Sequence, residues 1–110
     1  MNGLYISKLF FVNNWEKVQV NINSDVPAYD INSPGEGNTG GLEIGLVQEQ
    51  SEMSVSGAVT SYNSNRTQNG FTTELVYSLD TSGTTGDYYL VIKNASLNNC
   101  NCQVTVSIVN

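Results

Sequence analysis

The sequence predicts an all-β fold, an antiparallel β-sandwich with jelly-roll or Greek-key connections. Apolar and polar residues alternate with a period of two in several runs, and Gly-, Asn- and Ser-rich turns separate these runs. No stretch keeps a helical period over three turns, so no substantial helix is expected. At 110 residues the chain suits one two-layer core, which predicts a single domain over residues 1–110. A closed barrel is the structural alternative.

Seven strands are predicted, over residues 4–12, 15–23, 42–46, 53–59, 71–79, 88–93 and 103–109. The first run is apolar on both faces, as expected for a strand that is covered on each side. The second alternates cleanly, with Val18, Val20 and Ile22 on one face, and Asn13-Asn14 before it predicts a tight hairpin turn.

The later strands each show one apolar stripe. Their expected inward side chains are Leu42, Ile44 and Leu46, then Met53, Val55 and Val59 on a weaker strand, then Phe71, Thr73, Leu75, Tyr77 and Leu79, and finally Val104, Val106 and Ile108. A glycine-rich turn feeds the aromatic and β-branched run at 88–93, which is too short for anything but a strand.

Two long loops are predicted, over residues 25–41, which hold both prolines, and over residues 61–70, which are polar throughout. Loops held on a rigid sandwich are where binding residues concentrate. Each loop carries a tyrosine with little core to enter, and aromatic rings flanked by amides can stack on sugars or anchor a protein. The candidate ligand-binding residues are therefore Tyr29, Asn32, Tyr62, Asn63 and Asn65. Packing of both rings over the end of the sandwich is the alternative.

Charge and composition exclude several function classes. Ten acidic against four basic residues give a net charge of −6, which repels nucleic acid and anionic lipid. No apolar run is long enough to insert in a membrane. The N-terminus lacks the features of a signal peptide, and the Asn-, Ser- and Thr-rich composition favours a mature module outside the cell or on its surface.

No catalytic residue is expected. The chain has no histidine, so it lacks the base of a Ser-His or Cys-His pair. Glu43 and Glu74 are a carboxylate pair that a sandwich could bring together for glycoside hydrolysis, although solubilising roles are the ordinary explanation. We therefore expect a protein that is not an enzyme.

Calcium is the candidate cofactor. This cation takes six to eight oxygen ligands from carboxylates, amides and carbonyls. The first predicted loop supplies Asp25, Asp30 and Glu36 as candidate metal ligands, but their spacing matches no EF-hand. Ordinary acidic turn residues are the alternative.

The two cysteines, Cys100 and Cys102, are predicted to form a local disulfide in an oxidising compartment. An extended backbone holds residues two apart near the ~7 Å limit for a bridge, so the neighbouring asparagines must tighten the chain into a turn. Free thiols and links to another subunit are the alternatives, and zinc would find only half of its ligands here.

The order of these elements resembles the bacterial pre-peptidase C-terminal domain family of small β-sandwiches. The resemblance is carried by residues 75–79 with 86–92, and upstream by residues 18–22 and 42–46. It implies a non-catalytic module that binds matrix or carbohydrate, often with calcium, although the dense aspartates of the family's acidic loop are thin here.

The sequence thus predicts an extracellular accessory module that contacts a polysaccharide or protein surface through its end loops. The alternative function is a structural surface or filament subunit, a homo-oligomer whose terminal strands pair with a neighbour by strand addition. The apolarity of both faces of residues 4–12 favours that alternative.

Overall fold

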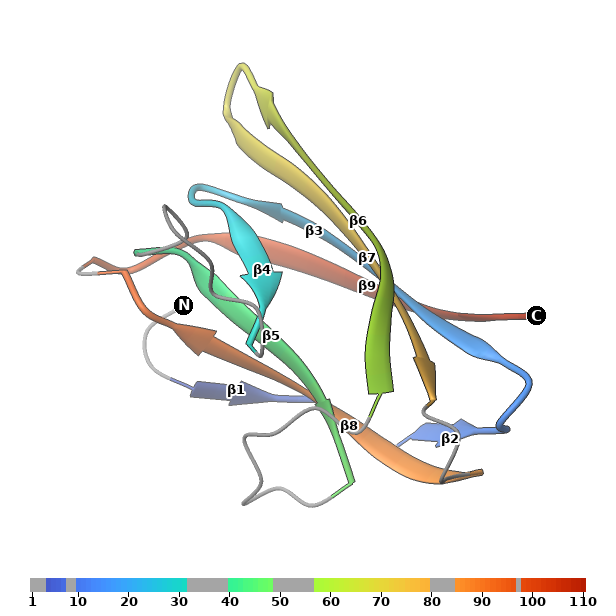
Figure 1. Cartoon of the computed structure of the whole chain (residues 1–110). Coiled ribbons are helices and arrows are strands. Elements are labelled where there is room, and N and C mark those ends of the chain that lie inside the picture. The colour runs from blue at the N-terminus through green and yellow to red at the C-terminus, as the bar shows by residue number, and fades with distance from the viewer. Residues whose placement is uncertain (1–3, 8–9, 32–39, 49–56, 80–84, 97) are drawn as a thin grey trace.

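The structure is a computed structural model of the chain, and its described residues are 4–7, 10–31, 40–48, 57–79, 85–96 and 98–110. These residues contain no helix and form two β-sheets that pack face to face (Figure 1). The strands are β1 (Leu4–Ile6), β2 (Phe10–Val12), β3 (Lys17–Ser24), β4 (Ala28–Asp30), β5 (Leu42–Val47), β6 (Gly57–Thr67), β7 (Gly70–Leu79), β8 (Gly86–Asn94) and β9 (Cys102–Val109). The predicted β-sandwich is therefore confirmed, with nine strands in place of seven. The described residues hold no helix long and apolar enough to cross a membrane.

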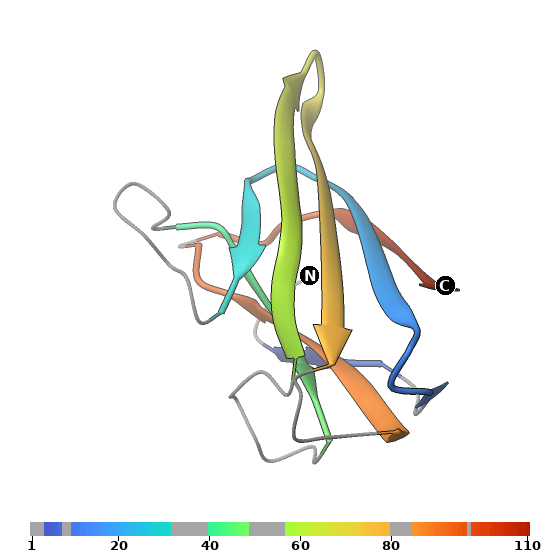
Figure 2. The same cartoon turned by 45° about the vertical axis from the view of Figure 1, so that its right-hand side comes forward.

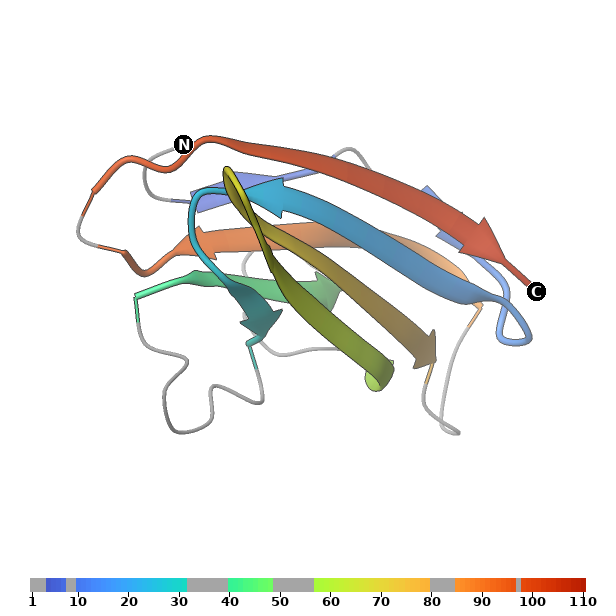
Figure 3. The same cartoon turned by 90° about the horizontal axis from the view of Figure 1, so that it is seen from above.

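The first sheet has the strand order β1-β8-β5-β4, with β2 also paired to β8, and the second has the order β6-β7-β3-β9. All pairs are antiparallel except the parallel pair of β4 with β5. Seen from above, the two sheets lie as separate layers, with β9 along one edge of its sheet (Figure 3).

The core lies between the two sheets and follows from the period-two alternation. Val18, Val20 and Ile22 of β3 are fully buried, as predicted, and so are the apolar residues of β5. The predicted inward face of β7 is buried from Thr73 to Leu79. Burying each large apolar side chain stabilises the folded state by about 1.5–3 kcal/mol, and this is the main contribution to the stability of such a core.

The N-terminal run differs from the prediction, because it forms two short strands on β8 instead of one. At the interruption the Ser7 amide donates to the Leu90 carbonyl (2.9 Å), and the Leu90 amide donates to the Ser7 hydroxyl (2.8 Å). A side-chain oxygen thus replaces a backbone acceptor. The prediction that both faces of this run are buried is wrong for Tyr5 and Phe11, whose side chains are exposed. Asn13-Asn14 is a turn but no hairpin, because β2 and β3 belong to different sheets.

The predicted loop over residues 61–70 is wrong. Strand β6 runs to Thr67 and forms a long hairpin with β7, which Figure 2 shows rising above the rest of the molecule. Polar residues on both sides of β6 hid its alternation. The first predicted loop holds β4, and residues 32–39 of it lie outside the described residues, as do Met53 and Val55.

Candidate functional site

The outer face of the second sheet is almost entirely polar. Register across its four strands aligns three rows of outward side chains. These rows, which we call the polar face, are Asn65-Thr72-Asn23-Gln103, Asn63-Glu74-Asn21-Thr105 and Ser61-Val76-Gln19-Ser107. Amides and hydroxyls dominate, and Glu74 is the single formal charge among the twelve. Such a surface offers closely spaced neutral donors and acceptors.

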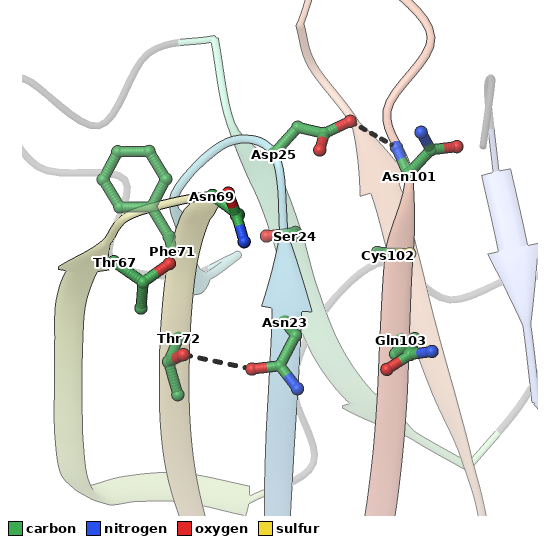
Figure 4. Close-up of a pocket in the computed structure, with 10 residues that line it drawn as sticks. All are labelled: Asn23, Ser24, Asp25, Thr67, Asn69, Phe71, Thr72, Asn101, Cys102 and Gln103. Atoms are coloured by element: carbon green, nitrogen blue, oxygen red, sulfur yellow. Dashed lines mark hydrogen bonds between the residues drawn. The ribbon is translucent and has the colours of Figure 1, made fainter.

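Hydrogen bonds between neighbouring strands hold parts of this face in place. Thr72 Oγ1 donates to Asn23 Oδ1 (3.1 Å), and Gln19 Nε2 donates to Glu74 Oε2 (3.0 Å). The Asn23 amide nitrogen lies on the side that faces β9 (Figure 4). Cross-strand pairs of this kind reduce the rotamer entropy that a ligand would otherwise have to remove.

A groove of about 410 Å³ opens at the upper end of the polar face. Three chain segments meet there: the end of β3, the β6–β7 turn and the start of β9 (Figure 4). Its lining residues are Asn23, Ser24, Asp25, Thr67, Asn69, Phe71, Thr72, Asn101, Cys102 and Gln103. Among the described residues, the lining therefore combines four amides and three hydroxyls with one aromatic ring, and Asp25 is the single carboxylate of this set.

Glycine at position 70 lets the β6–β7 turn approach β3. Its φ of +144° is a conformation that side-chain-bearing residues rarely adopt, and a Cβ there would lie 2.3 Å from the Ser24 carbonyl oxygen. Asp25 fixes the third segment, because its Oδ2 accepts a hydrogen bond from the Asn101 amide (2.8 Å) and its own amide donates to the Asn101 carbonyl (3.2 Å). The three walls of the groove are thus joined through backbone atoms.

The structure brings together only part of the predicted ligand site. Asn63 and Asn65 lie on the polar face. Tyr62 is 42% exposed but points to the other side of β6, where its hydroxyl donates to the Ala28 carbonyl (2.9 Å). Asn32 lies outside the described residues.

Tyr29 is not a loop aromatic, because it lies in β4 and only 3% of it is exposed. The register pairs it with Glu43 on β5, and Glu43 pairs in turn with Lys93 on β8. Burial, and then the charge and hydrogen bond of Glu43, raise the pKa of the Tyr29 hydroxyl. The structure therefore places Tyr29 in a buried strand and not in the exposed loop that the sequence predicted, and its contact with a ligand stays a prediction.

The predicted calcium ligands are not assembled within the described residues. Asp25 is engaged with Asn101, while Asp30 is buried and accepts a hydrogen bond from the Tyr77 hydroxyl (3.0 Å). Glu36 lies outside the described part of the chain. Within that part, no three His, Cys, Asp or Glu side chains come together as metal ligands. Calcium remains a prediction.

No disulfide joins Cys100 and Cys102 in the structure, and the predicted bridge stays a prediction. No turn forms between Cys100 and Cys102, so the backbone does not tighten as a bridge of residues two apart requires. Cys100 is buried in the core and Cys102 packs against it. Burial, and then the neighbouring Cys100 and Asp25, raise the pKa of the Cys102 thiol.

Glu43 and Glu74 cannot act as a catalytic pair. Glu43 belongs to β5 in the first sheet and Glu74 to β7 in the second, and each register places its glutamate on the outer side of its own sheet. The whole sandwich separates the two carboxylates.

Comparisons with known proteins found no matching family model, no similar curated protein and no similar solved structure. The resemblance to pre-peptidase C-terminal domains therefore stays a prediction. Sequence reasoning missed Asn21, Asn23, Thr72 and Gln103 as site residues, although the alternation in β3, β7 and β9 already marked them as outward. What it lacked was the pairing of the strands, which creates the rows.

Proposed function

We propose that this domain is a non-catalytic extracellular binding module that holds an uncharged polysaccharide along the polar face and in its groove. The observation that carries the proposal is the composition of the groove, whose described lining consists mainly of amides and hydroxyls together with one aromatic ring, Phe71. Sugar hydroxyls require neutral donors and acceptors at close spacing, and the apolar face of a sugar ring packs on an aromatic side chain. The proposed contact surface is therefore the outer face of the second sheet and not the end loops that the sequence predicted.

Charge narrows the class of ligand. The described lining residues include no lysine or arginine, and the one carboxylate among them, Asp25, already accepts a backbone hydrogen bond. The nearby Arg66 guanidinium lies 5.7 Å from the centre of the Phe71 ring, an arrangement that stabilises the ring position. With a net charge of −6, the protein repels uronic-acid and sulfated polymers, so neutral glycans are the favoured class.

The test is affinity electrophoresis and calorimetry with soluble glucans, xylans and mannans. The double variant N23A/Q103A removes two amides from adjacent strands, and two hydrogen bonds of about 0.5–1.5 kcal/mol each correspond to binding that is about 5- to 150-fold weaker. Asn14 is exposed at the opposite end of the molecule, so N14A is the matched control and should bind normally.

Trp15 provides the discriminating comparison. It is 68% exposed and lies before the start of β3, at the far end of that strand from the groove. A loss of binding in W15A with normal binding in N23A/Q103A would move the site to that end. Failure to bind any neutral glycan would overturn the proposal.

A further inference from the structure

Strand β9 is an unprotected sheet edge. Among the described strands it pairs only with β3, so alternate backbone amides and carbonyls along its eight residues point away from the sheet. Its sequence, CQVTVSIV, contains no charge, proline or glycine. Its register with β3 runs without a shift, so no bulge bends it away from a partner.

Every other edge of the described sheets carries a protective feature. Strands β1, β2 and β4 have three residues each, too few to pair extensively with another chain. Strand β6 has a register shift between Val59 and Ser61 and carries Arg66 near its end. Bulges and charges are the usual means of preventing edge pairing, and β9 has neither.

The sandwich is also open beneath this edge. Val106 and Ile108 face inward, yet they are 36% and 37% exposed. Beside them a cleft of about 260 Å³ between the sheets is lined by Tyr5, Ile92, Cys102 and Val104. These apolar side chains point to the interior but remain exposed to solvent, and one more strand added to the second sheet at β9 would cover them.

We propose that β9 pairs antiparallel with β9 of a second copy of this chain, to form a two-fold symmetric dimer with one continuous eight-stranded sheet. A second copy fits because the edge is self-complementary. Directly opposite residues of an antiparallel pair face the same side, so the partner strand adds Val and Ile to the inner layer and Gln, Thr and Ser to the outer one. Since β9 carries no charge, the acidic chains meet without charge repulsion at the contact.

The same features select a dimer over a filament. Pairing of β9 with β9 is isologous and uses the unprotected edge of both molecules, which closes the assembly. An open array through this sheet would need a second available edge, and β6 is bulged. The dimer would also join two polar faces side by side, although the pairing does not depend on the ligand proposed above.

The test is sedimentation equilibrium of the full chain over a concentration range of about 1 µM to 1 mM, since mass action then populates even a weak dimer. Val106→Lys places a charge in the shared apolar row and should raise the dimer dissociation constant by about tenfold or more. Asn63→Lys places the same charge on the outer side of the β6 edge and should leave the dimer dissociation constant unchanged.

Circular dichroism melts check that the variants fold. If V106K is unfolded, Thr105→Lys carries the same test from the outer face of β9, where the core is not disturbed. A chain that stays monomeric over the whole range overturns the proposal. So does a dimer that N63K disrupts and the β9 variants leave intact, or growth into polymers.

Discussion

The Tyr77 hydroxyl on β7 donates to Asp30 Oδ1 on β4 (3.0 Å) and lies 3.1 Å from the Ile44 carbonyl oxygen on β5. This contact crosses the interior and joins the two sheets through a fully buried ring. Two acceptors share a single hydroxyl proton. Because a buried carboxylate without its donor is costly, the pair holds β4 against the second sheet.

Replacing Tyr77 by Phe should lower the free energy of unfolding by about 1–3 kcal/mol, because the buried Asp30 carboxylate loses the hydrogen bond from Tyr77 while the ring remains. Urea denaturation followed by fluorescence measures this. Tyr62→Phe is the comparison, since that hydroxyl donates to Ala28 from a half-exposed ring and its loss should cost well under half as much. Equal effects would contradict the special role of Tyr77.

Stability should fall in alkali. Burial, and then the charge of Asp30, raise the pKa of Tyr77 far above its usual value of 10. Between pH 10 and the pKa of Tyr77 in the folded state, the unfolded chain loses the proton of the Tyr77 hydroxyl while the folded chain keeps it. Each such tyrosine then lowers the free energy of unfolding by about 1.4 kcal/mol per pH unit, and below pH 10 it contributes no slope. Denaturation curves from pH 7 to 11 should show a smaller slope in Y77F than in the wild type.

Alanine substitutions at three glycines should distinguish the cost of backbone strain from the cost of a steric clash. Gly70 combines a φ of +144° with a Cβ clash at Ser24, Gly40 has a φ of +84° with no atom within 4 Å, and a Cβ at Gly86 would meet only Gln48, at 3.5 Å. Alanine at Gly86 should therefore be nearly neutral, at Gly40 cost about 1–2 kcal/mol, and at Gly70 cost more. Thermal melts rank the three variants. A stable G70A would contradict the close approach of the β6–β7 turn to β3.

Alternation alone predicted the inward faces of β3, β5 and β7, because apolar residues recur at nearly every second position of each strand. It failed for β6, whose two sides are both polar, and for β4, where Ala28, Tyr29 and Asp30 are all buried. Burial of Asp30 depends on Tyr77, 47 residues away in the chain, so no local pattern could predict it. The polar face needed the strand order, which also comes from distant contacts.

Calcium should have little effect on the described part of the domain. Asp25 and Asp30 are each occupied by a protein donor, so binding a cation would break those contacts before any stabilisation appeared. Thermal melts in millimolar calcium and in chelator should coincide to within about 1 °C, since a site near its dissociation constant adds well under 1 kcal/mol. A rise of several degrees with calcium would restore the predicted metal site.

The two thiols should be present but slow to react. Because burial raises the pKa of Cys102, its thiolate fraction at neutral pH is below that of an ordinary cysteine, and Cys100 is buried in the core. Iodoacetamide should therefore label neither residue quickly in the folded protein and both quickly in denaturant without reductant. The labelling rate of Cys102 should reach its midpoint above the usual thiol pKa. An unlabelled peptide spanning both cysteines, lighter by two hydrogen atoms, would show that the disulfide forms after all.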